Sequence, residues 1–249
     1  MFQYVIESDT GRKREVNEDC VAVLNRPNGL LLALVADGMG GHNAGDVASR
    51  VTVDELSRKF LEADDAAFET AEARKAWLSE RILEVNRYVY EHAVNHIECK
   101  GMGTTLIAAL IDGEDCVLCH IGDSRVYLID SSVRLMTRDH SYVNVLVDNG
   151  EITQQQAEDH PKKNWIMRSL GTEPEIEREM HRFSLAGIPY LLICTDGLSN
   201  KLSEHEISSI VRSQASLAQK GKALIRLANE HGGEDNISFV LMKPRGEEV

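Results

Sequence analysis

Residues 31–38 read LLALVADG, and this stretch indicates the fold more clearly than any other part of the chain. Its unbroken apolar run is typical of a strand that is buried on both faces. Residues 190–197, YLLICTDG, have the same form and also end in Asp-Gly. A carboxylate at the tip of a buried strand is partly removed from water, so its ionised form needs a compensating cation. We therefore expect a β-rich core with a cation site where its strands end.

Five carboxylates fall at predicted strand ends, because Asp19, Asp123 and Asp235 join Asp37 and Asp196 there. A folded pair of sheets can bring such strand ends together. No histidine or cysteine shares this placement, and oxygen-only ligand sets favour Mg²⁺ or Mn²⁺ over zinc. For any one Asp-Gly pair a simple turn is the alternative explanation. Only the set of five favours a cation site.

The other segments are predicted from apolar periodicity and from turn-forming residues. Strands are expected at 2–7, 20–25, 30–36, 104–111, 116–121, 125–129, 133–136, 176–183, 189–195 and 236–242. Helices are expected at about 44–62, 68–98, 203–213 and 215–231. The central strands are joined by connections so short that only antiparallel neighbours can be linked. Antiparallel sheet flanked by long helices indicates the α+β class. With no repeat and no linker, we predict one domain over residues 1–249.

Charge and hydropathy exclude some classes of protein. The chain has 40 acidic and 27 basic side chains, a net charge of −13. This argues against a nucleic-acid or anionic-membrane surface, where positive charge supplies most of the affinity. The first residues resemble a strand and not a secretory leader. No apolar run approaches the roughly 20 residues that span a bilayer. We expect a cytoplasmic protein with no membrane segment.

One motif points to a different chemistry. Residues 116–120, CVLCH, match the C-x-x-C-H pattern of haem attachment. The segment itself is typical of a buried strand, on which residues three apart point to opposite faces. The two thiols of Cys116 and Cys119 could not then hold one ligand, so we predict core cysteines.

Six motifs, taken together, match those of a known family. In chain order they are REVNED at 14–19, VADGMGGH at 35–42, GMGTT at 101–105, IGDSR at 121–125, TDGL at 195–198 and GGEDNI at 232–237. Each is weak alone, but six in the family's order and at family-like spacing are highly specific. The chain resembles the PPM (type 2C) metal-dependent protein serine/threonine phosphatases, particularly their compact bacterial branch, over essentially its whole length.

The resemblance implies an αββα sandwich, with two antiparallel sheets between layers of helices and the metals at one end. It implies that Asp37 bridges two cations and that the backbone carbonyl of Gly38 helps to hold the second. Asp196 and Asp235 would hold the first cation. The expected cofactor is Mn²⁺ or Mg²⁺, with two or three ions per chain.

Further roles follow from the same resemblance. Asp19 would contact the ions through water, and Asp123 with Asp196 would form a weaker third site. Arg14 would bind the substrate phosphate, which a planar guanidinium grips in a bidentate manner; the alternative is a solvated arginine. Residues 139–175 resemble the mobile flap of bacterial members, and we expect this flap subdomain to lie beside the metals and to influence substrate choice.

The mechanism that the resemblance implies uses no covalent intermediate. Two divalent ions that share a water lower its pKa and present hydroxide to the phosphorus. Asp37, Asp196 and Asp235 are therefore catalytic as ligands. Eukaryotic members carry a histidine directly after the Asp-Gly, thought to protonate the leaving group, where this chain has Met39. His42 is our candidate for a substitute or for a substrate contact, with a loop histidine packing on the next helix as the alternative.

Three functions stay open at this point. The leading one is a phosphoserine/phosphothreonine protein phosphatase that opposes a bacterial Ser/Thr kinase and acts as a monomer on phosphorylated protein substrates. A second keeps the fold and metals but takes another phosphoester, or a regulatory protein of the anti-sigma-antagonist type. A third is a catalytically dead binding module, which is disfavoured because every matched ligand is an intact aspartate.

Overall fold

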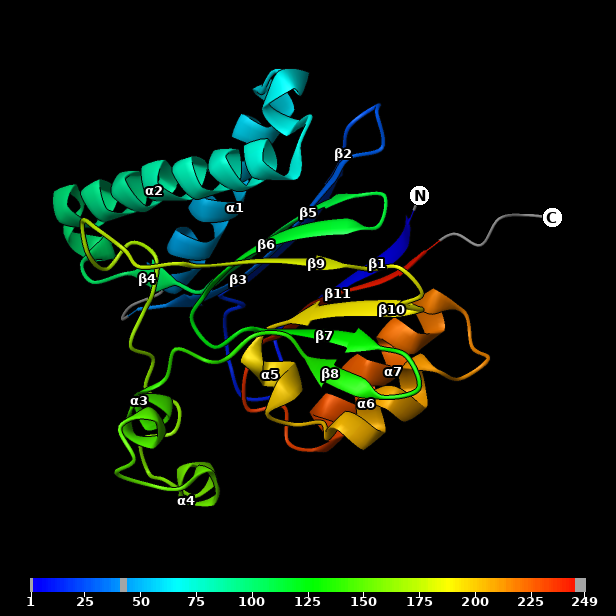
Figure 1. Cartoon of the computed structure of the whole chain (residues 1–249). Helices are drawn as coiled ribbons and strands as arrows, with labels where there is room; N and C mark the ends of the chain where they lie inside the picture. Colours follow the sequence, from blue (N-terminus) through cyan, green and yellow to red (C-terminus); the bar gives the residue numbers. More distant parts are fainter. Residues whose placement is uncertain (1, 41–43, 245–249) are drawn as a thin grey trace.

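The computed structural model of the chain describes residues 2–40 and 44–244. Two antiparallel sheets lie face to face, with helices on the outer face of each (Figure 1). The predicted α+β class and the αββα sandwich are therefore confirmed.

The strands of each sheet come from both halves of the chain. The first sheet has the order β1 (Phe2–Asp9), β11 (Ile237–Pro244), β10 (Tyr190–Cys194), β7 (Arg125–Ile129) and β8 (Val133–Leu135). The second has the order β2 (Asp19–Asn25), β3 (Leu31–Met39), β5 (Leu106–Asp112), β6 (Asp115–Ile121) and β9 (Glu179–Ser184), and the short β4 (Gly103–Thr104) pairs with β3. Since β1 pairs with β11, the two ends of the described chain are joined in one sheet.

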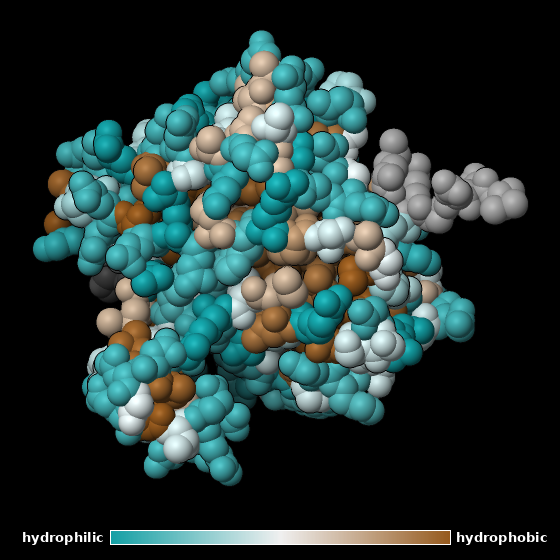
Figure 2. Space-filling model, in the orientation of Figure 1, coloured by the Kyte–Doolittle hydropathy of each residue, from teal (hydrophilic) through white to brown (hydrophobic). Residues whose placement is uncertain are grey.

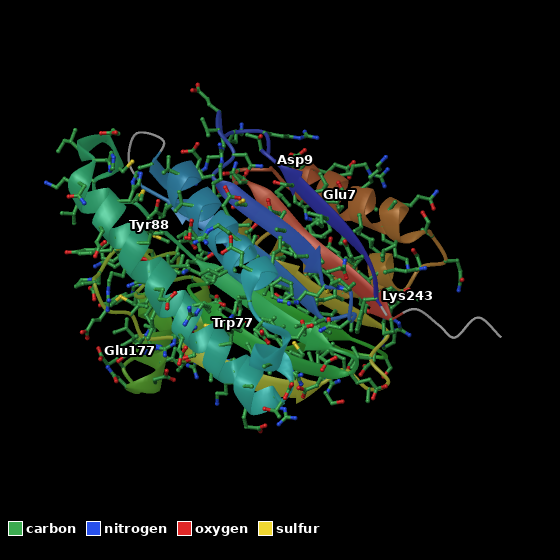
Figure 3. All side chains as sticks on the ribbon, turned by 90° about the horizontal axis from the view of Figure 1, so that it is seen from above. Glu7, Asp9, Trp77, Tyr88, Glu177 and Lys243 are labelled. Carbon is green, nitrogen blue, oxygen red and sulfur yellow. The ribbon has the colours of Figure 1, made fainter. Side chains whose placement is uncertain are left out.

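Helices form the outer layers. The long α1 (Ala44–Glu62) and α2 (Ala71–Asn95), with the 3₁₀ turns η1 (Asp65–Phe68) and η2 (Ile97–Cys99), cover the second sheet. On the first sheet lie α6 (Glu204–Val211) and α7 (Leu217–Glu230), next to the one-turn helix α5 (Asp196–Ser199). Seen from above, α1 and α2 lie side by side, and β1 and β11 run together near α7 (Figure 3).

The core is layered because side chains alternate along each strand. On β3, Leu32 and Leu34 contact the α1 and α2 layer. Leu31, Ala33 and Val35 lie between the two sheets. The unbroken apolar run therefore results from burial on both faces, as predicted.

The same alternation settles the haem-like motif. Cys116 packs between the sheets, whereas Cys119 packs under the helices on the opposite face of β6. Both thiols are free and buried. The prediction of core cysteines is confirmed.

Some predicted boundaries were wrong, for local reasons. The helix expected from 68 begins at Ala71, because the Thr70 side chain accepts a hydrogen bond from the Ala73 N–H and caps it. The strand expected at 104–111 divides into β4 and β5 at Thr105. The helical turn α5 was not predicted, since four residues carry too little periodicity to detect.

Residues 139–175, which we call the flap, carry α3 (Tyr142–Asp148) and α4 (Gln154–Glu158). They form a lobe beside the sheets (Figure 1). The lobe shows apolar surface (Figure 2), and Val145, Trp165 and Met167 are exposed there. No helix within residues 2–40 and 44–244 combines the length and apolar character needed to cross a membrane.

Candidate metal centre

The fold brings the five predicted aspartates to one end of the sandwich. Asp19 begins β2 and lies opposite Asp37 near the end of β3 in the antiparallel register. Asp123 lies in the turn between β6 and β7, and Asp196 begins α5 just after β10. Asp235 precedes β11, the neighbour of β10. The predicted strand-end placement thus holds, although β3 continues to Met39, two residues beyond its aspartate.

These carboxylates are crowded and short of partners. One oxygen each of Asp19, Asp123 and Asp196 is buried and has no hydrogen-bond partner among the described residues. Burial, and next the charge of Asp235, raises the pKa of Asp196 to about 6. Burial also raises the pKa of Asp19 to about 7. In Asp37, burial and then the charges of Asp19 and Asp196 raise the pKa well above its usual range.

Bound divalent cations would address both the missing partners and the repulsion between carboxylates. Bound cations and their water molecules would supply partners for the orphaned oxygens, and the positive charge would offset the repulsion between the carboxylates. The donors are all oxygens, which is the ligand set of Mg²⁺ and Mn²⁺. The residues present therefore fit the expected cofactor.

Buried hydroxyl groups fix the position of Asp37. Its backbone N–H donates to Thr105 Oγ1 at 2.9 Å, and Thr105 Oγ1 lies 2.8 Å from Ser124 Oγ. Its carbonyl oxygen accepts from Thr104 Oγ1 at 2.9 Å and from the Thr105 N–H at 2.8 Å. Sequence reasoning quoted the Thr-Thr pair as a motif but missed this role, which depends on contact between β3 and the start of β5.

Gly38 lies where β3 passes close to the start of α1. A Cβ atom on this residue would stand 2.1 Å from the Gly45 carbonyl oxygen, so no other residue fits without moving the backbone. The Gly38 N–H donates to the Glu18 carbonyl at 3.0 Å. The glycine thus allows the tip of β3, the start of β2 and the start of α1 to meet beside Asp37.

Arg14 points toward the carboxylates. Its Nη2 lies 3.0 Å from both carboxylate oxygens of Asp235, and its Nη1 lies 3.7 Å from Glu18 Oε2. The side chain is still 46% exposed, so a ligand can reach it. Arg14 is therefore ion-paired and not a freely solvated arginine, and its contact with phosphate stays a prediction.

The loop that carries Arg14 is tied to the last strand by Asn236, which sequence reasoning did not single out. Asn236 Oδ1 accepts from the Glu18 N–H at 2.8 Å, and Nδ2 donates to the carbonyls of Thr10 at 2.9 Å and Val16 at 3.0 Å. One buried amide therefore holds residues 10–18 in place. The sequence signals were its place in the GGEDNI motif and a polar side chain at the start of a mostly apolar strand.

An open groove of about 760 Å³ connects the carboxylates with the flap. Asp123, Asp196 and Asp235 line it on the side of the sheets, and Asn144 and Lys163 line it on the side of the flap. The expectation that the flap lies beside the carboxylates is thus met. His42, the predicted proton donor, lies outside the described residues.

Lys162, the residue before the groove-lining Lys163, contacts aromatic side chains of the flap instead of the groove. Its Nζ lies 4.1 Å from the centroid of the Trp165 ring and 5.4 Å from that of Tyr142. Such cation–π contacts hold the lysine against the flap's own aromatic side chains. Of the two adjacent lysines, Lys163 is the one that lines the groove.

Comparison with known proteins gives one consistent result. The family model described as Protein phosphatase 2C matches residues 10–241. The serine/threonine phosphatase stp of Listeria welshimeri is 40% identical over 95% of this chain and 93% of its own. The crystal structure of Stp1 from Staphylococcus aureus has a TM-score of 0.93 at 34% identity, covering 99% of this chain and 96% of that one.

A further structure bears on the cofactor. The catalytic domain of the phosphatase PstP, solved with two manganese ions, has a TM-score of 0.82 at 33% identity over 97% of each chain. Its metals match the oxygen-rich character of the aspartate cluster described above. By sequence, fold and family model alike, this chain belongs to the protein phosphatase 2C family.

Proposed function

We propose that this chain is a metal-dependent protein phosphatase that hydrolyses phosphoserine and phosphothreonine in other proteins. The observation that carries the proposal is the meeting of five carboxylates and Arg14 at one end of an open groove. The buried oxygens without partners mark the place for cations, and the guanidinium beside them suits a phosphate. The names and metals of the relatives support the same reading.

Asp37, Asp196 and Asp235 would hold the cations, together with the carbonyl of Gly38, while Asp123 would hold a third ion and Asp19 would bind through water. When bound, two such ions supply a water whose pKa is lowered toward neutrality, which makes it a competent nucleophile for phosphorus.

The chain's own groups position the phosphate. Arg14, already aligned by Asp235 and Glu18, would donate two parallel hydrogen bonds to phosphoryl oxygens. Because Asp235 also faces the proposed cations, the guanidinium is held at a fixed place relative to them. Preorganisation of this kind stabilises the charge that develops as the ester bond breaks. The groove of about 760 Å³ is large enough to admit a phosphorylated side chain.

The test is hydrolysis of p-nitrophenyl phosphate and of a phosphothreonine peptide by the metal-stripped chain. We expect no turnover in EDTA, recovery on addition of Mn²⁺ or Mg²⁺, and loss of turnover in Asp37→Asn with the circular dichroism spectrum unchanged. Full activity in chelator would sink the metal mechanism. Turnover of the small ester without any turnover of phosphopeptides would instead support another phosphoester as the substrate.

The biological setting is also a proposal. We infer a chain organised as one domain with the flap as a subdomain, acting in the cytoplasm as a monomer and opposing a Ser/Thr kinase. The free state of all five cysteines fits a reducing compartment. Phosphoproteomics on a strain that carries Asp196→Asn would identify the substrates and, through their sites, the kinase.

A further inference from the structure

The loop between β1 and β2 carries three consecutive cations, Arg12, Lys13 and Arg14. The run stands out in a chain whose net charge is −13, and it lies directly beside the carboxylates of the candidate metal centre. Arg14 is the proposed phosphate contact and is paired with Asp235. Arg12 and Lys13 have no role in the proposed function.

These two side chains carry charges that the protein itself does not neutralise. Arg12 and Lys13 are both exposed, and neither forms an ion pair with a carboxylate among residues 2–40 and 44–244. Arg14 differs, because Asp235 and Glu18 both pair with it. The positive charges of Arg12 and Lys13 can therefore meet an anion from outside the chain.

The backbone under the two cations is held against the loop that precedes β11. The Arg12 N–H donates to the Gly233 carbonyl at 2.7 Å. Gly11 has φ +79°, and a Cβ atom on it would stand 2.2 Å from the Asp235 carbonyl oxygen, so only glycine allows this close approach. Asp9, which ends β1 (Figure 3), accepts from the Gly11 N–H at 2.9 Å. The cations of this loop are thus presented from a fixed place beside a proposed metal ligand.

The same loop borders the groove on the side of the sheets. Glu234 and Lys201 line the groove there and form an ion pair. The hydrogen bond from Lys201 lowers the pKa of Glu234 most, and the charge of Lys13 lowers it further, which places Lys13 near this edge. Because Lys201 already neutralises Glu234, the charge of Lys13 is in excess at this end of the groove.

The spacing along the loop sets how far a second anion would lie from the first. Two residues span at most about 7 Å of chain, so Arg12 and Arg14 are close together compared with the reach of their side chains. An extended peptide covers the same distance in two or three residues. A peptide with its phosphate at Arg14 would therefore bring residues about one to three positions from the phosphoresidue over Arg12 and Lys13.

We propose that Arg12 and Lys13 form a second anion subsite, which selects phosphorylated segments that carry another carboxylate or phosphate within about three residues of the phosphoserine or phosphothreonine. The inference rests on the proposed function, in which Arg14 binds the phosphate that is removed. Carboxylates and phosphates offer the same oxygen acceptors to a guanidinium and an ammonium. Since the chain as a whole is acidic and repels such segments, the basic loop also determines where they approach.

The experiment measures kcat and KM in Mn²⁺ at low salt for phosphothreonine peptides that differ in one residue. Glutamate, phosphoserine or glutamine stands at each position up to about three residues from the phosphothreonine. At one or more positions, the glutamate and phosphoserine peptides should exceed the glutamine peptide in kcat/KM by roughly twofold to tenfold, through KM, as exposed charge pairs predict. The difference should shrink as salt is added.

Arg12→Gln combined with Lys13→Gln removes both charges and should bring the ratio of kcat/KM between acidic and glutamine peptides to about one. Lys75→Gln combined with Lys222→Gln is the matched control, because it removes the same charge from exposed residues of α2 and α7. This control should keep the wild-type ratio. Equal kcat/KM for acidic and glutamine peptides in wild type, a ratio unchanged by the loop variant, or an equal loss in the control overturns the inference.

Binding without turnover separates this inference from the proposed function. Fluorescence anisotropy of the same peptides on Asp37→Asn should give a Kd for the acidic peptides that is roughly twofold to tenfold lower than for the glutamine peptide. If that difference is present but wild type hydrolyses none of the peptides, the result counts against the proposed function alone. Equal Kd values, with hydrolysis by wild type intact, count against the subsite alone.

Discussion

Asp196→Asn should make the metal-free chain more stable at neutral pH, even though it removes a proposed metal ligand. In the folded chain the pKa of Asp196 is about 6, because of burial and then the charge of Asp235, whereas its ordinary value is 3.8. Ionisation of this side chain at pH 7.5 therefore opposes folding by about 3 kcal/mol. The amide carries no charge and can still accept from Asn200, as the carboxylate does at 3.0 Å.

The sign follows from the raised pKa. Between 3.8 and about 6 the folded state binds a proton that the unfolded state has lost, so stability falls as the pH rises through this range. The advantage of the variant should be full above about pH 7, should shrink as the pH falls through 6 and should vanish below 3.8.

The assay is urea unfolding in EDTA, followed by circular dichroism between pH 4 and 7.5. At pH 7.5 the variant should gain up to about 3 kcal/mol, or roughly 6–12 °C in melting temperature for a chain of this size. Glu91→Gln, which neutralises an exposed carboxylate on α2, is the control and should change little. A variant no more stable than wild type at pH 7.5, or a gain of equal size at pH 4, would refute the reasoning. Adding Mn²⁺ should stabilise wild type and reverse the order.

Two further substitutions test the groups around Asp37. Arg14→Ala should lower kcat/KM for a phosphothreonine peptide roughly tenfold to a hundredfold, because charge-assisted hydrogen bonds to phosphate are lost. Arg14→Lys should give a value between those of Arg14→Ala and wild type. Steady-state kinetics that match wild type would exclude the contact. Thr105→Val should lower the free energy of unfolding by about 1–3 kcal/mol, because the buried Asp37 N–H loses its acceptor. Urea titration measures this, and Glu91→Gln, at an exposed position on α2, is the comparison that should change little.

Much of the architecture could be predicted because its signals are local. The apolar run before Asp37 shows burial on both faces, and short connections between strands require antiparallel neighbours. The strand-end aspartates could be predicted for the same reason, because each one directly precedes or follows a strand in the sequence. That Asp19 and Asp37 face one another needed the register of two strands, which the structure supplies.

The groups that hold the site together could not be predicted in this way. Asn236 acts on Thr10 and Val16, more than two hundred residues earlier in the chain. The Gly122 N–H donates to His140 Nδ1 at 3.1 Å, and this contact joins the start of the flap to the turn between β6 and β7. Neither contact leaves a periodic trace in the sequence, because each joins segments that only the finished fold brings together.

The placement of the aspartates has a consequence for how the metal and the fold depend on each other. Asp19, at the start of β2, lies near the beginning of the chain, and Asp235, just before β11, lies near its end. Strand β11 pairs with β1 in the first sheet. When no cation is present, the ionised carboxylates of Asp19 and Asp235 repel each other, and this repulsion pushes the two segments apart. A cation that binds the folded chain and not the unfolded one adds stability in proportion to its affinity. Metal binding should therefore hold the start of β2 beside the start of β11, and loss of metal should loosen Arg14 and its loop before it disturbs the helical layers.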